Sequence, residues 1–270
     1  MSVSSPEKID WVRPLQQVAP FIAGRGGVVL VSGFPTSAAN TFVKLVRHEV
    51  SKNPTSLCVS LDFGEAYERY PDGILANLEQ AVVAEKASVG GANVLTNNAA
   101  GRDMSMTNVF IGNRVEGSGQ EAKLNLRRAG QIIKAAGERG RSGRVALFCF
   151  NYYNMLPETA SWFWKQMWEG GLNNLTEAGL LIVCEHESPD GSQPGSIPPE
   201  YTPVHLPASY ESADRELVRE ELTACIIRKL NNDPATAQTQ AETLLVEWMY
   251  YPAKLHSGLS VWLAGKKNTF

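Results

Sequence analysis

The stretch from Val28 to Leu45 constrains the fold of this chain more than any other. It opens with the apolar run Val28–Val31, breaks at Gly33, crosses a loop of small residues and enters a segment with apolar residues at helical spacing. This order predicts a buried strand, a loop and a helix. A phosphate-binding loop, or P-loop, has the same layout.

The P-loop pattern G-x-x-x-x-G-K-[ST] requires a second glycine, a lysine for the outer phosphates and a hydroxyl for magnesium. Counted from Gly33, these three positions hold Ala38, Ala39 and Asn40. The layout is kept, whereas the groups that bind and activate a nucleotide are absent. An ordinary strand-to-helix turn that never held a nucleotide is the alternative that this loop alone leaves open.

A register shifted by one residue does not restore the motif. Thr41 then takes the hydroxyl position, but Phe34 replaces the first glycine and Asn40 replaces the lysine. The predicted degenerate phosphate loop therefore comprises Gly33, Thr36, Ala38, Ala39, Asn40 and Thr41.

The strand predicted over 144–151 corresponds to the one that carries the acidic half of a nucleotide site in P-loop ATPases. In ATPases of this class it ends in acidic residues that organise magnesium and polarise water. Asn151 and Tyr152 stand there instead. A neutral amide cannot neutralise a metal ion, so we predict a degenerate acidic site, no metal and no cofactor, and hence a protein that is not an enzyme.

The charge and residue composition of the chain limit the classes of partner and ligand that it can bind. A formal net charge of −3 argues against a nucleic-acid surface, which requires clustered basic residues. The densest basic group is typical of a solvated helix and turn: Arg127, Arg128, Lys134, Arg139, Arg141 and Arg144. The four cysteines have no metal-ligand spacing, and no apolar run approaches ~18 residues. We therefore expect a cytoplasmic protein without a membrane span.

Further apolar runs at 57–63, 179–184 and 204–207 alternate with helical patterns. This alternation predicts an α/β fold, a P-loop NTPase-like three-layer fold with a central, mostly parallel sheet. His186 follows the run 179–184, where such proteins carry a polar sensor of the γ-phosphate, although an isolated histidine there is also typical of a surface. We expect an α/β domain over residues 1–207 and a small, lid-like helical segment over residues 208–270.

Two segments are candidates for contact with a partner. The insertion over residues 88–119 is rich in Gly, Asn, Ser and Thr, and we expect it to be mobile, with an apolar cluster of Val109, Phe110 and Ile111. The helix that begins at Pro157 carries Trp162, Trp164 and Trp168. Trp164 and Trp168 share one face of this helix, and Phe163 and Met167 share a neighbouring face. At most one of these two pairs is expected to be deeply buried, with the other exposed to a partner.

The chain resembles the STAND class of P-loop NTPases, and in particular the degenerate branch called inactive STAND, found in bacterial conflict and antiviral systems. The segments that carry this resemblance are 29–35, 59–63, 148–151 and 181–183, with the tryptophan-rich helix. The resemblance implies a scaffold or adaptor that links a sensor to an effector such as a protease.

Two other function classes stay open. The protein could be a working or nucleotide-sensing NTPase whose lysine comes from Lys44, one turn into the helix, or from a neighbouring subunit. It could also be a nucleic-acid-associated, ATPase-like subunit of a defence or transposition complex.

Overall fold

The computed structural model describes residues 11–83, 119–188, 198, 200–210 and 212–267. Its centre is a parallel sheet with the strand order β2-β3-β4-β1-β5. The strands are β1 (Gly27–Gly33), β2 (Ser56–Asp62), β3 (Arg144–Phe150), β4 (Leu181–Glu187) and β5 (Thr202–His205).

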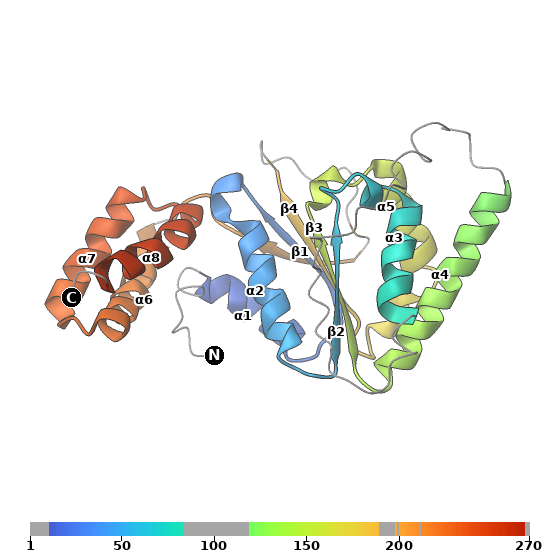
Figure 1. The fold of residues 1–270 in the computed structure, drawn as a ribbon, viewed down its shortest axis with the longest axis horizontal. Coiled ribbons are helices and arrows are strands. Elements are labelled where there is room, and N and C mark those ends of the chain that lie inside the picture. Colours follow the sequence, from blue (N-terminus) through green and yellow to red (C-terminus); the bar gives the residue numbers. More distant parts are fainter. Residues whose placement is uncertain (1–10, 84–118, 189–197, 199, 211, 268–270) are drawn as a thin grey trace.

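The position of β4 decides what meets at the end of the sheet. β4 lies between β1 and β3, although β2 and β3 both precede it in the sequence. Because all strands are parallel, their last residues lie at one edge, which we call the carboxyl edge (upper edge in Figure 1). The loop after β1 therefore lies next to the end of β4, the kind of place where open α/β sheets bind ligands.

Helices cover both faces of this sheet. On one face lie α1 (Val12–Ile22) and α2 (Ala39–Ser51), which share an apolar cluster with β1, β3 and β4. On the other lie α3 (Pro71–Leu78), α4 (Gly119–Gly140) and α5 (Pro157–Trp162), as Figure 1 shows. All seven residues of β3 are buried, as expected of a strand covered on both sides. The expected three-layer α/β fold is confirmed.

Short 3₁₀ and π-helical turns connect or extend the helices and strands. The 3₁₀ turns are Pro35–Ser37, Tyr67–Arg69, Tyr152–Asn154 and Leu172–Leu175, and the π-helical turns are Glu79–Val83 and Phe163–Trp168.

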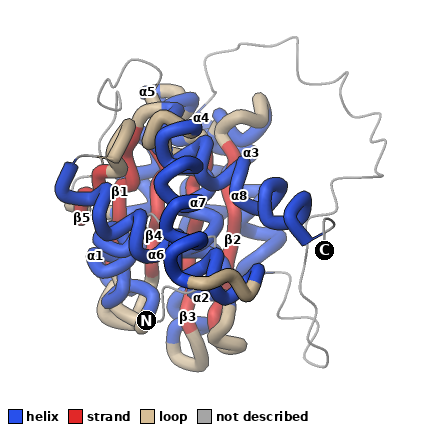
Figure 2. The backbone as a smooth tube through the Cα atoms, turned by 90° about the vertical axis from the view of Figure 1, so that its left-hand side faces the viewer, coloured by secondary structure: helices blue, strands red, loops and turns tan. Residues whose placement is uncertain are grey.

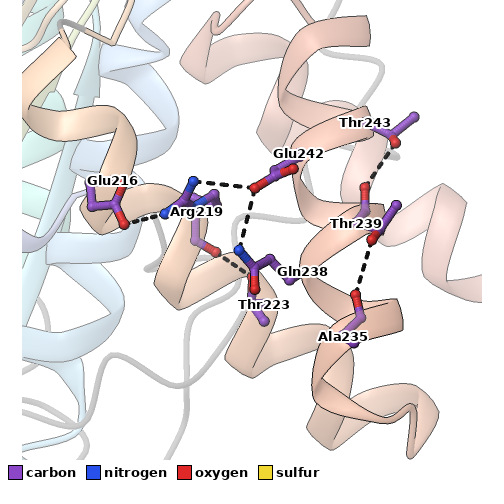
Figure 3. A network of polar contacts seen from close by, with 8 residues as sticks. All are labelled: Glu216, Arg219, Thr223, Ala235, Gln238, Thr239, Glu242 and Thr243. Carbon is purple, nitrogen blue, oxygen red and sulfur yellow. Dashed lines mark hydrogen bonds and ion pairs between the residues drawn. The ribbon is translucent and has the colours of Figure 1, made fainter.

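The C-terminal helices have an apolar cluster of their own. They are α6 (Ser212–Leu230), α7 (Pro234–Glu247) and α8 (Pro252–Lys267). In Figure 2 they lie in front of the sheet, on the side of α1 and α2. Arg219 on α6 forms ion pairs with Glu216 and, at 3.2 Å, with Glu242 on α7 (Figure 3). The domain boundary at residue 207 stays a prediction.

Helix α8 connects this group to the α/β layers. It packs against the turn Pro35–Ser37 that follows β1. The rings of His256 on α8 and Trp11, just before α1, stack with centroids 3.8 Å apart. Trp11 in turn meets the Phe42 ring edge-on at 5.3 Å.

The strand β4 is longer than the sequence pattern predicted. It continues past Cys184 to Glu187, because its pairing with β1 persists to Gly33. His186 is therefore a buried strand residue, not the surface residue that its position after an apolar run suggested.

The prediction that one of the two side-chain pairs on the tryptophan helix is exposed is wrong. Trp164 and Trp168 are both buried, as are Phe163 and Met167, and Trp162 is partly buried. The segment winds as a π-helix, shown by the Glu169 N to Trp164 O hydrogen bond of 3.0 Å. The wider π-helical turn changes the angular spacing that an α-helix would give, and all four side chains belong to the apolar cluster of the core.

The other contact candidate is the apolar cluster of the insertion over residues 88–119. Val109, Phe110 and Ile111 lie outside the described residues. Among the helices that are described, none combines the length and the apolar character that a membrane span requires.

Candidate functional site

The loop after β1 keeps one backbone feature of a phosphate loop. Ala38, at the second-glycine position of the motif, has a φ of 58°, in the left-handed region that favours glycine. Helix α2 begins at the next residue, Ala39. The backbone thus makes the turn for which a glycine is expected, although the glycine is absent.

Ser37 closes this loop from within. The carbonyl of Phe34 accepts hydrogen bonds from the Ser37 N–H at 2.8 Å and from the Ser37 Oγ at 2.6 Å. The Ser37 side chain is fully buried, and a Cβ on Gly33 would lie 2.0 Å from its Oγ. A phosphate cradle requires loop N–H groups directed at the anion, whereas this N–H is used inside the loop.

The lysine position faces the core. Ala39 is 0% exposed and belongs to the apolar cluster that contains Val31 and Phe42. Thr36 and Asn40 are partly buried, and Thr41 is exposed. Lys44 lies one turn further along α2 with an exposed side chain.

Two carboxylates from β4 lie opposite the start of α2. Glu185 pairs with Val31 and Glu187 with Gly33, and residues two apart on a strand share a face. Glu185 is 1% exposed, and its Oε2 accepts a hydrogen bond of 2.6 Å from the Asn151 N–H.

Burial raises the pKa of Glu185, and the Asn151 N–H lowers it in part. The Asn40 side chain and the Glu187 N–H also lower this pKa, while the charge of Asp62 raises it. The Oε1 of Glu185 meets no hydrogen-bond criterion among the described residues, although the Asn40 side chain lies close enough to lower the pKa of this carboxyl.

The Glu187 carboxyl lies close to the N-terminus of α2. Burial raises its pKa to about 7, the neighbouring charge of Glu185 raises it too, and the Asn40 N–H lowers it. Asn40 is the second residue of α2, so the carboxylate of Glu187 faces the first turn of that helix. This is the position at which the helix dipole and free N–H groups attract an anion.

Asn151 and Tyr152, the two residues of the predicted degenerate acidic site, have different neighbours. Asn151 has a φ of 53°, and its Nδ2 donates to the Asp62 Oδ1 at 2.6 Å. Tyr152 is buried against α3 and α5, where its hydroxyl accepts a 2.7 Å hydrogen bond from the Trp164 Nε1. Burial raises the pKa of this phenol.

Sequence reasoning missed the carboxylates at this edge. Glu68 accepts hydrogen bonds from the Asp62 N–H and, at 2.8 Å, from the Asn77 Nδ2, and burial raises its pKa. Asp62 ends β2, and Glu185 and Glu187 lie at the end of β4, with β3 between the two strands. The alternation Glu-His-Glu after a wholly apolar run was the available pattern, because it continues a strand of period two.

The described residues hold no group of three or more His, Cys, Asp and Glu side chains placed to bind a metal ion. All four cysteines are free, and Cys149, Cys184 and Cys225 are buried.

No protein-family model matches the chain, and no curated protein matches it. Among solved structures, it is similar to a chain of the Drosophila ORC bound to DNA, with a TM-score of 0.40 and 13% identity, over 94% of this chain and 64% of that one. It is also similar to a Walker-type ATPase of Pyrococcus abyssi, with a TM-score of 0.46 and 11% identity, over 92% of this chain and 65% of that one. The chain thus spans less than two thirds of the length of either structure.

Proposed function

We propose that this protein is a catalytically inactive, P-loop NTPase-like scaffold or adaptor that acts through contacts with other proteins. The observation that carries the proposal is the carboxylate of Glu187 beside the first turn of α2. A phosphate at that helix end would meet Glu187 and, behind it, Glu185. Glu187, with its pKa raised by burial to about 7, is about half ionised at neutral pH, and in its ionised form it repels the anion that an ATPase must bind.

The missing groups support the same conclusion. Phosphoryl transfer depends on a lysine and metal ions that neutralise the developing charge. A charge-assisted contact contributes about 1.5–3 kcal/mol to binding. Ala39 supplies none, because its side chain is a methyl group, and that methyl group is buried in the core. A helix N-terminus alone contributes only about 0.3–2 kcal/mol, and here a carboxylate of the chain already faces it.

The resemblance of the sequence to inactive STAND supports a place in a bacterial defence system, with a sensor or an effector such as a protease as partner. The free cysteines suit a reducing, cytoplasmic setting. The gene neighbourhood tests this setting, since a sensor or protease gene is expected beside this one.

Hydrolysis assays and thermal shifts with magnesium-ATP and magnesium-GTP test inactivity. We expect no hydrolysis above the blank and no change in melting temperature. A ligand at a hundredfold excess over its Kd would stabilise the protein by about 2.7 kcal/mol, a shift of several degrees. Hydrolysis that co-elutes with the protein and disappears in Lys44→Ala would instead support the working NTPase, because Lys44 is exposed and its loss leaves the fold intact.

A further inference from the structure

We propose that the outer face of helix α4 docks an acidic helix of a partner protein. Lys123, Arg127 and Lys134 form this face, which we call the basic face, and the exposed leucines Leu124 and Leu126 flank it. This inference rests on the proposed scaffold function and names the chemistry of the partner.

The three residues of the basic face lie in one line along the helix. Arg127 and Lys134 follow Lys123 by four and eleven residues, which places all three within about 40° of one another at 3.6 residues per turn. At a rise of 1.5 Å per residue, the line is about 16 Å long. All three residues are exposed, and the positions between them, Gly130 and Gln131, are exposed and uncharged.

Helix α4 packs on the rest of the protein through its opposite side. Ala129, Ile132 and Ala136 lie on that side and belong to the apolar cluster that covers the sheet. Through it the helix contacts α3, β3 and the turns that follow α3 and α5. In Figure 1, α4 forms the right-hand margin of the described ribbon, so its outer face is open to a partner.

The arginine that faces α3 is neutralised, whereas the basic face is not. Arg128 forms ion pairs with Asp72 at 2.9 Å and with Glu79 at 2.8 Å. Lys123, Arg127 and Lys134 form no ion pair with any residue that the structure describes. The positive charge of this face is therefore left for groups from outside the described chain.

The single sign of the charge is unusual for a helix face that meets only water. Solvated faces commonly mix both signs, whereas Lys123 and Arg127 are like charges four residues apart, an arrangement that destabilises a helix. Among the α4 residues whose side chains are described, the one acid is Glu138, which is half-buried and already takes part in an interaction. Carboxylates of a partner would remove the repulsion along the line.

The two leucines favour a protein over other polyanions. Leu124 is 55% exposed and Leu126 is 48% exposed, and in helical projection they lie on either side of Lys123. A partner helix can bury them while its carboxylates meet the basic face, whereas phosphate groups offer leucine nothing. A membrane-binding helix presents one continuous apolar face, whereas here the charges lie between the leucines.

The spacing of the charges suits a helix. Seven residues, or about two turns, separate Arg127 from Lys134. Carboxylates seven residues apart share one side of a partner helix, so a helix that lies along α4 can meet both cations at once. Such charge complementarity fixes the register and selects the partner.

The test is a fluorescence anisotropy titration of the full-length protein into a labelled, blocked peptide of about 25 residues, long enough to form a helix. The peptide consists of alanine and glutamine, with glutamates at the spacing of the basic face and leucines beside them. A second peptide of equal composition spreads its glutamates around the helix. We expect the first peptide to bind more tightly, and less so as the salt concentration rises. Equal affinity of the two peptides would overturn the proposal.

Arg127→Gln combined with Lys134→Gln should weaken binding about fivefold, the loss of two surface ion pairs. Lys44→Gln combined with Lys165→Gln is the matched control, because it removes two exposed lysines from other elements and gives the same net charge. The control should bind like the wild type, and circular dichroism confirms that both variants fold. Equal weakening in the control would contradict the basic face, since attraction would then follow net charge alone.

Duplex DNA and phosphatidylserine vesicles are titrated in the same way. Tighter binding of either one than of the acidic peptide, weakened by the Arg127 and Lys134 changes, would overturn the acidic helix in favour of a nucleic acid or a membrane.

A parallel assay with magnesium-ATP separates the two proposals. Failure of the acidic peptide to bind, without ATP hydrolysis, overturns the acidic helix and leaves the scaffold function standing. Hydrolysis of ATP by the protein overturns the scaffold function itself.

Discussion

Gly33 and Ser37 are coupled across the loop that follows β1. A Cβ at position 33 would lie 2.0 Å from the Ser37 Oγ and 2.9 Å from its Cβ. Gly33→Ala should therefore lower the free energy of unfolding by about 1–3 kcal/mol through overpacking. Ser37→Ala alone should cost about 1 kcal/mol, because it removes the 2.6 Å hydrogen bond to the Phe34 carbonyl.

The double variant should cost less than the sum of the two single changes, because removing the Ser37 Oγ relieves the closest contact. Urea denaturation of the four proteins measures this coupling. Thr36→Ala, in the same turn, is the control and should combine additively with Gly33→Ala. Full additivity for Ser37→Ala as well would show that the two residues do not meet as described.

Glu187 gives the stability of the protein a dependence on pH. Its pKa rises from 4.5 to about 7 on folding, so between these values the folded state binds more protons than the unfolded state. The free energy of unfolding therefore falls as pH rises through this window. Glu185 and Glu68, whose pKa values burial also raises, add a slope in the same direction.

Glu187→Gln should flatten this slope. From about pH 5 to about pH 8, the wild type should lose roughly 1–2 kcal/mol more than the variant, a figure reduced for the partial exposure of Glu187. Urea denaturation at the two pH values provides the measurement, with Glu169→Gln as an exposed control that keeps the wild-type slope. A variant with the full wild-type slope would contradict the assigned pKa.

At the scale of elements, β4 shows how far the sequence could predict this protein. Its apolar half was recognisable because a strand buried on both faces is a continuous apolar run. Its last residues were missed because Glu-His-Glu is polar, whereas their burial comes from pairing with β1 up to Gly33. Counting residues along the P-loop motif located the altered loop positions. Glu185 and Glu187 lie opposite that loop only because β4 is placed between β1 and β3 in the sheet. That order is a long-range property which local patterns do not contain.

The tryptophan helix shows a second limit. Spacing on an ideal α-helix separates Phe163 from Trp164 and predicts one exposed pair, whereas the π-helical turn gathers both against the sheet. Trp164 meets the rings of Phe163 and Trp168 edge-on, with centroids 5.0 and 6.0 Å apart. The local winding follows from packing in the folded protein, so residue spacing alone could not reveal it.

This buried cluster supplies the third prediction. Tyr152→Phe should lower the free energy of unfolding by about 1–3 kcal/mol, because it removes the 2.7 Å hydrogen bond and leaves the buried Trp164 Nε1 without its acceptor. Tyr153→Phe is the matched control, since that neighbouring side chain is 42% exposed. Equal stability of the two variants in urea would show that the Tyr152 hydroxyl is not required.

At the scale of the whole molecule, the C-terminal helices lie on the side of the sheet that α1 and α2 cover, beside the altered loop (Figure 1). Helix α8 packs on the turn Pro35–Ser37, and its His256 stacks on Trp11. The ion pair between Arg13 and Asp214 also connects the two parts at 2.9 Å, but the Arg13 side chain is 60% exposed. An ion pair this exposed contributes little to stability, so the stacked rings of His256 and Trp11 are the stronger connection.

His256→Ala should therefore loosen α8 from the loop without unfolding the C-terminal helices, which keep their own apolar cluster. Hydrogen exchange of the Thr36 and Ser37 amides should accelerate about 2–10-fold, the effect of losing about 0.5–1.5 kcal/mol of ring stacking. Amides in the middle of α6 and α7 should keep their wild-type rates, and Arg13→Ala should change neither group. Faster exchange throughout α6 and α7 would instead show that the helices and the loop open as one unit. In that case a partner that moves α8 would have to unfold the whole group, and local exposure of the loop could not serve as a signal to a partner.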